Sequence, residues 1–217
     1  DDLPKIAMPL SPKNDWDKWE DIVAKTEPMT ESPTRDGDEM ATIVYTSGST
    51  GQPKGVMISF KAMGASAAGV GKILEINQDD RMLSYLPLAH VLERMLVETH
   101  CLIYGFTVYF AESLTTFVED LKRASPTLFV SVPRLWLKFQ LGVFKKMPAK
   151  KLKMFLKIPI LRGIVRKKVL TNLGLANVRF AGSGSAPIPP SLIQWYRDLG
   201  LELLEAYGMS ENFALSH

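Results

Sequence analysis

The sequence predicts an α/β fold in which a largely parallel sheet is flanked by helices. Short apolar and β-branched runs, which are typical of buried strands, recur through the chain after residue 38. Longer segments with the apolar spacing of helices separate these runs, and such alternation is typical of a parallel sheet covered on its faces. In sheets of this kind ligands bind beyond the carboxyl ends of the strands.

The expected elements follow one another in chain order. Apolar, β-branched runs predict strands at residues 41–46, 82–86, 107–111, 128–132, 178–181 and 201–205. Helical patterns lie between them at residues 60–73, 91–104, 116–124, 133–147 and 190–199. Ser59 and Thr115 stand where the first and third helices need an N-terminal cap, and Gly200 follows the last helix as a stop signal.

Length and composition indicate one main domain. With 217 residues, 46% of them apolar, the chain can bury a sizeable core. Residues 1–38 are rich in proline and charge and carry Trp16 and Trp19, so we expect a connecting segment there. The domain itself is expected over residues 39–217.

A single cysteine, Cys101, rules out an internal disulfide and indicates a reducing, cytoplasmic compartment. It lies in an apolar stretch and is expected to be a core residue. As a nucleophile it would need a base, and the adjacent His100 would point elsewhere on a helix. No charged-then-apolar leader opens the chain, and no apolar run approaches the roughly 20 residues of a membrane span.

The most specific motif is a loop rich in glycine and hydroxyl groups, Tyr-Thr-Ser-Gly-Ser-Thr-Gly-Gln-Pro-Lys-Gly-Val, directly after the first strand. Its glycines let the backbone turn and bring N–H groups close to an anion. Its hydroxyls and its lysine add donors and one mobile positive charge. The residues expected to hold phosphate are Thr46, Ser47, Gly48, Ser49, Thr50, Gly51, Lys54 and Gly55.

Two other interpretations of this loop are less well supported. The phosphate loop of nucleotide triphosphatases needs glycine before its lysine and a hydroxyl residue after it. Here Pro53 precedes Lys54 and has no N–H to give, while Gly55 follows and offers magnesium no hydroxyl. A flexible linker is disfavoured because linkers seldom begin on a strand.

Other segments follow the loop in a fixed order. Residues 86–94 read Leu-Pro-Leu-Ala-His-Val-Leu-Glu-Arg, residues 182–187 read Gly-Ser-Gly-Ser-Ala-Pro, and residues 207–211 read Tyr-Gly-Met-Ser-Glu. With the loop, they resemble the phosphate loop, the His motif, the glycine-rich turn and the Tyr-Gly-x-Thr-Glu motif of the adenylate-forming (AMP-binding) enzymes. The His motif and residues 132–136 resemble long-chain fatty acyl-CoA synthetases in particular.

The resemblance implies a fatty acid–CoA ligase, which uses ATP and Mg²⁺ to make an acyl-adenylate and then transfers the acyl group to CoA. The implied catalytic residues are Lys54, which would hold the leaving pyrophosphate, Ser210, which would bind the α-phosphate, and Glu211, which would ligate magnesium. The implied nucleotide contacts beyond the loop are Gly182, Ser183, Gly184, Ala186, Pro187, Tyr207, Gly208 and Ser210. His90, Gly182 and Gly184 are expected to line the acyl pocket.

The same resemblance implies that a ribose-binding aspartate, a hinge and a small domain with a catalytic lysine lie beyond His217. Residues 39–217 are therefore expected to be the central part of a large N-terminal domain that does not turn over alone. Two alternatives stay open: a ligase that loads a carrier protein, and a non-enzymatic nucleotide-binding or membrane-associated module. The acyl chain length and the oligomeric state are also open, and an oligomer is compatible with the sequence.

Residues 138–168 form a basic amphipathic stretch. They carry eleven lysines and arginines and no acidic residue, so that removing these charges from the net charge of +3 leaves −8 on the rest of the chain. Pro148 and Pro159 interrupt the stretch. One interpretation is a solvated helical face; the other is peripheral contact with the anionic inner face of a membrane. Nucleic acid is not an expected partner, because no recognised binding motif accompanies the charge.

Overall fold

The computed structural model describes residues 4–47, 51–214 and 216, and the chain divides into two units at Arg35 and Asp36. The first unit holds a parallel pair of two-residue strands, β1 (Ile6–Ala7) and β2 (Asp17–Lys18), and helix α1 (Trp19–Lys25). Among its described residues Ala7 alone is buried. It therefore lacks a hydrophobic core of its own.

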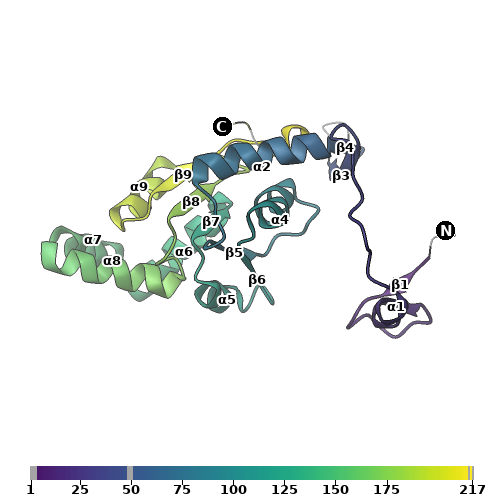
Figure 1. The fold of residues 1–217 in the computed structure, drawn as a ribbon. Coiled ribbons are helices and arrows are strands. Elements are labelled where there is room, and N and C mark those ends of the chain that lie inside the picture. Colours follow the sequence, from purple (N-terminus) through teal and green to yellow (C-terminus); the bar gives the residue numbers. More distant parts are fainter. Residues whose placement is uncertain (1–3, 48–50, 215, 217) are drawn as a thin grey trace. The chain divides into compact units, whose positions relative to one another are not determined.

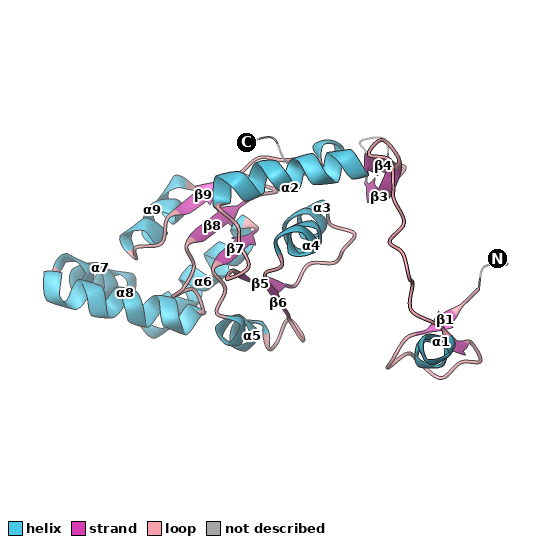
Figure 2. Cartoon of the chain, viewed as in Figure 1, coloured by secondary structure: helices cyan, strands magenta, loops and turns pink. Residues whose placement is uncertain are grey.

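The second unit is built on parallel strands. These are β5 (Arg81–Ser84) paired with β6 (Thr107–Phe110), and β7 (Leu128–Ser131), β8 (Phe180–Ser183) and β9 (Leu203–Glu205) in that order. Figure 2 shows β7, β8 and β9 side by side. The Thr127 N–H donates to the Arg81 carbonyl (3.0 Å), which brings β7 beside β5. The α/β fold class with parallel strands is confirmed.

A cluster of charge and hydroxyl holds the amino ends of three strands together. Asp80, Thr127 and Arg179 directly precede β5, β7 and β8. The Arg179 guanidinium donates to both carboxylate oxygens of Asp80 (2.9 and 2.6 Å), and the Thr127 hydroxyl donates to the same carboxylate (2.6 Å). Arg179 also donates to the Leu74 carbonyl (2.6 Å) at the end of the long helix α2 (Phe60–Leu74). This cluster lies at the opposite strand ends from the predicted ligand edge.

Helices complete the unit around an aromatic core. They are α5 (Phe117–Ala124), α6 (Pro133–Lys146), α7 (Ala149–Lys157), α8 (Pro159–Leu173) and α9 (Pro190–Asp198). Proline at the first position of α6, α8 and α9 starts each helix, since its missing N–H has no partner there. Trp136 and Tyr196 are fully buried, and the Tyr196 hydroxyl donates to the Trp136 carbonyl (2.7 Å). Figure 1 shows α7 and α8 running alongside each other.

The predicted phosphate loop lies in a β-hairpin rather than between a parallel strand and a helix. Strand β3 (Met40–Thr46) pairs antiparallel with β4 (Lys54–Ser59), with Thr46 opposite Lys54. The sequence did not predict β4, because its Lys-Gly start continues a glycine-rich loop. Ser59 then caps α2 as expected: its hydroxyl accepts from the Ala62 N–H (3.2 Å).

Two other local predictions need correction. The helix expected over residues 91–104 is divided into α3 (Val91–Glu93), a π-helical segment η1 (Arg94–Thr99) and α4 (His100–Tyr104). The Thr99 hydroxyl donates to the Arg94 carbonyl (2.7 Å), five residues back, as the wider π turn allows. The N-terminal cap of α5 is Thr116 rather than Thr115.

The structure also describes the expected helix stop, the single cysteine and the helix lengths. Gly200 follows α9 with a φ of +85°, as a stop signal requires. Cys101 is partly buried against the core, and its thiol donates to the Phe106 carbonyl (3.5 Å). No helix among the described residues has the length and apolar character needed to cross a bilayer.

Candidate active site

Four of the predicted motif segments leave the carboxyl ends of neighbouring parallel strands. Residues 85–90 follow β5, residues 132–136 follow β7, residues 184–187 follow β8 and residues 206–211 follow β9. Backbone bonds continue the pairing past the strands: the Gly184 N–H donates to the Ser131 carbonyl (3.1 Å) and the Ala206 N–H to the Ser183 carbonyl (2.8 Å). The structure therefore gathers these segments at one edge, where ligands bind in folds of this class.

The glycine-rich turn after β8 starts inside the sheet. Gly182 pairs with Val130 of β7, and a β-carbon at Gly182 would lie 3.0 Å from the Val130 side chain. The indole N–H of Trp136 donates to the Gly182 carbonyl (3.1 Å) and fixes its direction. The Ser183 hydroxyl is buried and has no hydrogen-bond partner among the described residues. Burying a hydroxyl without a hydrogen bond costs free energy, so the Ser183 hydroxyl is a candidate to hydrogen-bond a ligand.

The rest of this turn is exposed and is held by a residue that the sequence did not single out. Ser185 adopts a left-handed conformation (φ 67°), and Ala186 and Pro187 are exposed. The Glu205 carboxylate at the end of β9 accepts from the Ile188 N–H (3.0 Å) and anchors the turn. Glu205 stands two residues before the Tyr-Gly-Met-Ser-Glu motif, but no sequence signal marks it for this role.

The segment after β9 presents Tyr207, Ser210 and Glu211. Tyr207 is 61% exposed at the strand end, and Ser210 and Glu211 lie in the short 3₁₀ helix η2 (Ser210–Asn212). A β-carbon at Gly208 would come 2.5 Å from the Ala214 carbonyl oxygen, so only glycine fits there. This close approach folds the segment back on itself and leaves the Glu211 side chain exposed.

The hairpin that carries the phosphate loop lies against this segment. A cavity of about 340 Å³ is lined by β4, the first turns of α2 and η2, including Ser59, Ser66 and Glu211. The Ser66 hydroxyl donates to the Phe213 carbonyl (3.1 Å), which ties α2 to the end of η2. The structure thus brings the strand that begins at Lys54 next to the helix that carries Glu211.

The structure describes part of the predicted phosphate loop. Thr46 ends β3, and its hydroxyl donates to the Lys54 carbonyl across the hairpin (3.5 Å). Ser47, Gly51, Lys54 and Gly55 are exposed, and Gly51 has a φ of +80°, which favours glycine. Gly48, Ser49 and Thr50 lie outside the described residues.

The segment with His90 is fixed by a buried carboxylate. His90 caps α3, because its Nδ1 accepts from the Leu92 N–H (3.3 Å), and that bond leaves the ring proton on Nε2 in the neutral form. Glu93 is 3% exposed and accepts from the Ser84 hydroxyl (2.6 Å) and from the N–H groups of Tyr85 and Leu86. Burial raises the pKa of Glu93 despite these bonds. Sequence reasoning assigned Glu93 no role of its own.

Tyr85 joins this segment to the neighbouring strand. Its hydroxyl lies 2.9 Å from the Ser131 hydroxyl and 3.1 Å from the Val130 carbonyl of β7. Burial raises the pKa of Tyr85 to about 12, so the phenol stays neutral at physiological pH. It therefore links the His90 segment to the end of β7 by hydrogen bonds.

The residues present fit a nucleotide better than a protein-only metal site. No group of three His, Cys, Asp or Glu side chains that could hold a metal occurs in the described part of the chain. A magnesium ion at Glu211 would therefore take its other ligands from phosphate and water, as magnesium in phosphate-transfer sites commonly does. A nucleotide could stack its base on the exposed ring of Tyr207 and accept a hydrogen bond from the Ser183 hydroxyl. Its phosphates could accept from backbone N–H groups of the hairpin loop.

Comparisons with known proteins agree with this geometry. Residues 3–217 match the family model of the AMP-binding enzymes. The chain is 33% identical over 201 residues to the peroxisomal acyl-CoA ligase 891 of Penicillium brevicompactum and 31% identical over 207 residues to the long-chain-fatty-acid–CoA ligase ACSBG2 of Xenopus laevis. Each match covers 81% of this chain and 28% of the relative, so the chain spans under a third of those proteins.

A solved structure of an enzyme domain that binds AMP also superposes on this chain. The A domain of carboxylic acid reductase from Segniliparus rugosus, in complex with AMP and a co-purified carboxylic acid, superposes with a TM-score of 0.67 at 26% identity. The superposition covers 89% of this chain and 32% of that one.

Proposed function

The chain belongs to the AMP-binding enzyme family, and from this premise we propose that it forms part of an ATP-dependent acid–thiol ligase that activates a fatty acid and transfers it to CoA. The observation that carries the proposal is the gathering of four motif segments at one sheet edge, beside the hairpin with the glycine loop. Because the chain spans 28% of its relatives, we propose that residues 39–217 are the central part of a larger N-terminal domain and residues 1–38 a connecting segment.

The proposed reaction has two steps. A carboxylate oxygen of the fatty acid attacks the α-phosphorus of ATP, the bond to the bridging oxygen breaks, and pyrophosphate leaves with both electrons of that bond. The thiol of CoA then displaces AMP from the acyl-adenylate and loses its proton. The first step brings two anions together, so the site has to neutralise charge.

The residues of this chain divide that task. Lys54 and the loop N–H groups hold the pyrophosphate as it leaves, and Ser210 donates to the α-phosphate. Glu211 holds magnesium, which neutralises phosphate charge when bound. Tyr207, exposed at the end of β9, stacks on the adenine, while the buried Ser183 hydroxyl donates to it.

The acyl group lies on the other side of the glycine-rich turn. His90 at the start of α3 lines its pocket together with Gly182 and Gly184. The cap bond from the Leu92 N–H to His90 Nδ1 and the buried, hydrogen-bonded Glu93 favour a positioning role for this segment over acid–base catalysis. A fatty acid is the proposed substrate because the relatives include proteins named as acyl-CoA and long-chain-fatty-acid–CoA ligases. A cytoplasmic location is proposed because a single cysteine suits a reducing compartment.

The full-length protein supplied with a fatty acid, ATP and CoA tests the proposal. We expect pyrophosphate, AMP and acyl-CoA as products, and Lys54→Ala and Glu211→Ala should each reduce pyrophosphate release at least about tenfold, since each removes a charge contact to phosphate. Lys72→Ala and Glu112→Ala, which change exposed residues away from the motifs, are the matched controls.

Each other outcome identifies a different error. Acyl-adenylate that forms without acyl-CoA would refute CoA as the acceptor and favour transfer to a carrier protein. Pyrophosphate release that persists unchanged in both site variants would refute the site assignment. No carboxylate-dependent release at all would refute the enzyme and leave a binding module.

A further inference from the structure

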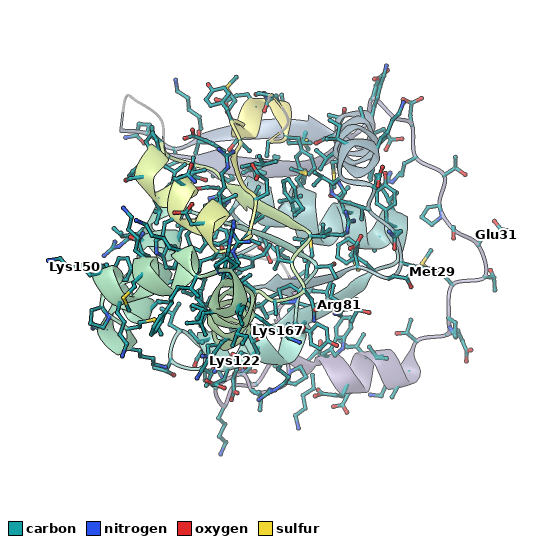
Figure 3. The ribbon with its side chains drawn as sticks, turned by 90° about the vertical axis from the view of Figure 1, so that its left-hand side faces the viewer. Met29, Glu31, Arg81, Lys122, Lys150 and Lys167 are labelled. Atoms are coloured by element: carbon teal, nitrogen blue, oxygen red, sulfur yellow. The ribbon has the colours of Figure 1, made fainter. Side chains whose placement is uncertain are left out.

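Helices α6, α7 and α8 carry a concentration of positive charge that nothing in the proposed reaction uses. The stretch from Lys138 to Lys168 holds eleven cations and no carboxylate. Within the part of the chain that the structure describes, none of these cations forms a salt bridge. Figure 3 looks onto this region and shows Lys150 of α7 pointing away from the ribbon. An ordinary solvated helical face would carry charges of both signs. The all-positive charge of these helices therefore indicates an anionic partner.

The same three helices also expose large aliphatic side chains. Ile160 is 81% exposed, Ile164 62%, Met154 52% and Leu141 50%. Ile160 and Ile164 stand eight and four residues before Lys168 in α8, and this spacing places all three on one stripe of the helix. Isolated apolar residues on a surface are common, but here they alternate with unpaired cations over three consecutive helices.

A groove between α6 and α8 combines both features. Its volume is about 880 Å³, and its rim carries Lys138, Lys145 and Lys146 of α6 and Lys168 of α8, with Arg134 at the start of α6. Its floor is apolar and is formed by the buried Phe139, Val169 and Leu173. All residues that line it belong to the described part of the chain, and none of them is acidic. Such a groove suits a molecule with an anionic head and a hydrocarbon chain.

We propose that this groove, defined as the basic groove by the residues just named, is a docking site for an anionic phospholipid at the surface of a bilayer. The lipid phosphate lies among the rim lysines, and an acyl chain lies on the apolar floor. Ile160 and Ile164 enter the headgroup region beside it, as the apolar face of an interfacial helix does. The cations add electrostatic attraction to the anionic leaflet. This inference goes beyond the proposed function, since it concerns where the enzyme is held and not what it catalyses.

The aliphatic side chains decide between a membrane and other polyanions. Nucleic acid or an acidic protein would satisfy the lysines of the basic groove but would leave exposed Ile160 and Ile164 without a favourable environment. A bilayer satisfies both, because its phosphates lie directly above hydrocarbon. Four of the eleven cations line this one groove, Lys138, Lys145, Lys146 and Lys168, so a planar surface can engage them together.

Co-sedimentation of the full-length protein with vesicles tests the proposal. The vesicles are phosphatidylcholine alone or phosphatidylcholine mixed with phosphatidylserine, at low and at high salt. We expect binding to the mixed vesicles that weakens as salt rises, and little binding to phosphatidylcholine alone. Indifference to lipid charge or to salt would overturn the proposal.

Charge-reversed variants locate the contact. Lys138→Glu, Lys145→Glu and Lys168→Glu combined should lower affinity for mixed vesicles at least about a hundredfold, because losing the positive charge of each lysine alone accounts for about fivefold. The control combines Lys13→Glu, Lys18→Glu and Lys25→Glu in the first unit, which makes the same change in net charge. Equal losses in the two variants would show attraction by net charge alone and overturn the basic groove as the site.

A third variant separates lipid from soluble anions. Ile160→Ser combined with Ile164→Ser keeps every charge, and we expect it to weaken vesicle binding most clearly at high salt, where apolar contact dominates. Unchanged binding of this variant would contradict insertion into the bilayer. Pyrophosphate release from a soluble substrate should stay at the wild-type level in all three variants, which checks their folding, and sedimentation itself needs no catalysis.

Discussion

Replacing Asp80 by asparagine should destabilise the fold by about 3 kcal/mol. The carboxylate is 3% exposed and accepts two hydrogen bonds from Arg179 and one from Thr127. Breaking a buried pair by removing one partner costs about 3–5 kcal/mol. The lower end of that range applies, because the Arg179 side chain is 38% exposed and water can solvate it once the carboxylate is gone.

The effect should depend on pH with a defined sign. Burial alone would raise the pKa of Asp80, but the bonds from Arg179, Thr127 and the Asn77 N–H outweigh it and hold this pKa below its ordinary value. A carboxyl whose pKa is lowered by folding contributes stability above the pKa of the unfolded chain, about 3.9, and loses it as pH falls through the folded value. The difference between wild type and Asp80→Asn should therefore be constant near neutral pH and shrink below about pH 4.

Urea unfolding followed by tryptophan fluorescence measures the free energy at each pH, with Asp79→Asn as control. Asp79 is adjacent in sequence and exposed, so its substitution should change stability by less than about 0.5 kcal/mol. If Asp80→Asn were as stable as Asp79→Asn at pH 7, or if its deficit persisted undiminished in acid, the reasoning would be refuted. Because the cluster lies at the amino ends of the strands, we expect the KM for ATP to be unchanged.

Two further predictions concern buried groups near the site. Ser183→Ala should leave stability in urea unfolding unchanged or slightly higher, because the Ser183 hydroxyl has no protein partner to lose. If this hydroxyl donates to the nucleotide, the same substitution should raise the KM for ATP about fivefold. An unchanged KM would exclude that contact. Burial raises the pKa of Glu93, so its contribution to stability is present below the unfolded pKa and lost as pH rises through the folded one. Gln does not titrate, so the free energy of unfolding of Glu93→Gln should rise relative to that of the wild type as pH rises. Urea unfolding at several pH values measures this difference. A difference that instead grows in favour of the wild type would contradict the prediction.

The sequence predicted the strands and most helices well because their signals are local. Apolar runs mark β5 to β9, Ser59 caps α2, and the prolines that divide the basic stretch do end and begin helices, with Pro148 before α7 and Pro159 opening α8. Local patterns failed where a partner decides the structure. Strand β4 exists because β3 pairs with it, and nothing in Lys-Gly-Val-Met-Ile-Ser distinguishes that strand from the loop before it.

The candidate site shows the same limit. Its glycines, Ser210 and Glu211 could be found because they stand in contiguous motifs. Glu205, Tyr85 and Glu93 could not, because their roles depend on hydrogen bonds to Ile188, Ser131 and Ser84. The arrangement that brings Lys54 and Glu211 onto neighbouring elements is also a property of the folded chain. The catalytic roles themselves stay predictions until the variants are measured.

The connection between β7 and β8 has a further consequence for how this fold can vary. The two strands are adjacent and in register, with Ser131 opposite Ser183, yet 48 residues of helix and turn separate Ser131 from Phe180 along the chain. Strand pairing fixes the register whatever the length of this excursion, and doubling a connection costs only about 0.6 kcal/mol in closure entropy. Helices α7 and α8 can thus be shortened, extended or exchanged while the carboxyl edge of the sheet stays in place. The membrane docking proposed for α6 and α8 and the reaction proposed at the sheet edge could therefore evolve independently within one polypeptide.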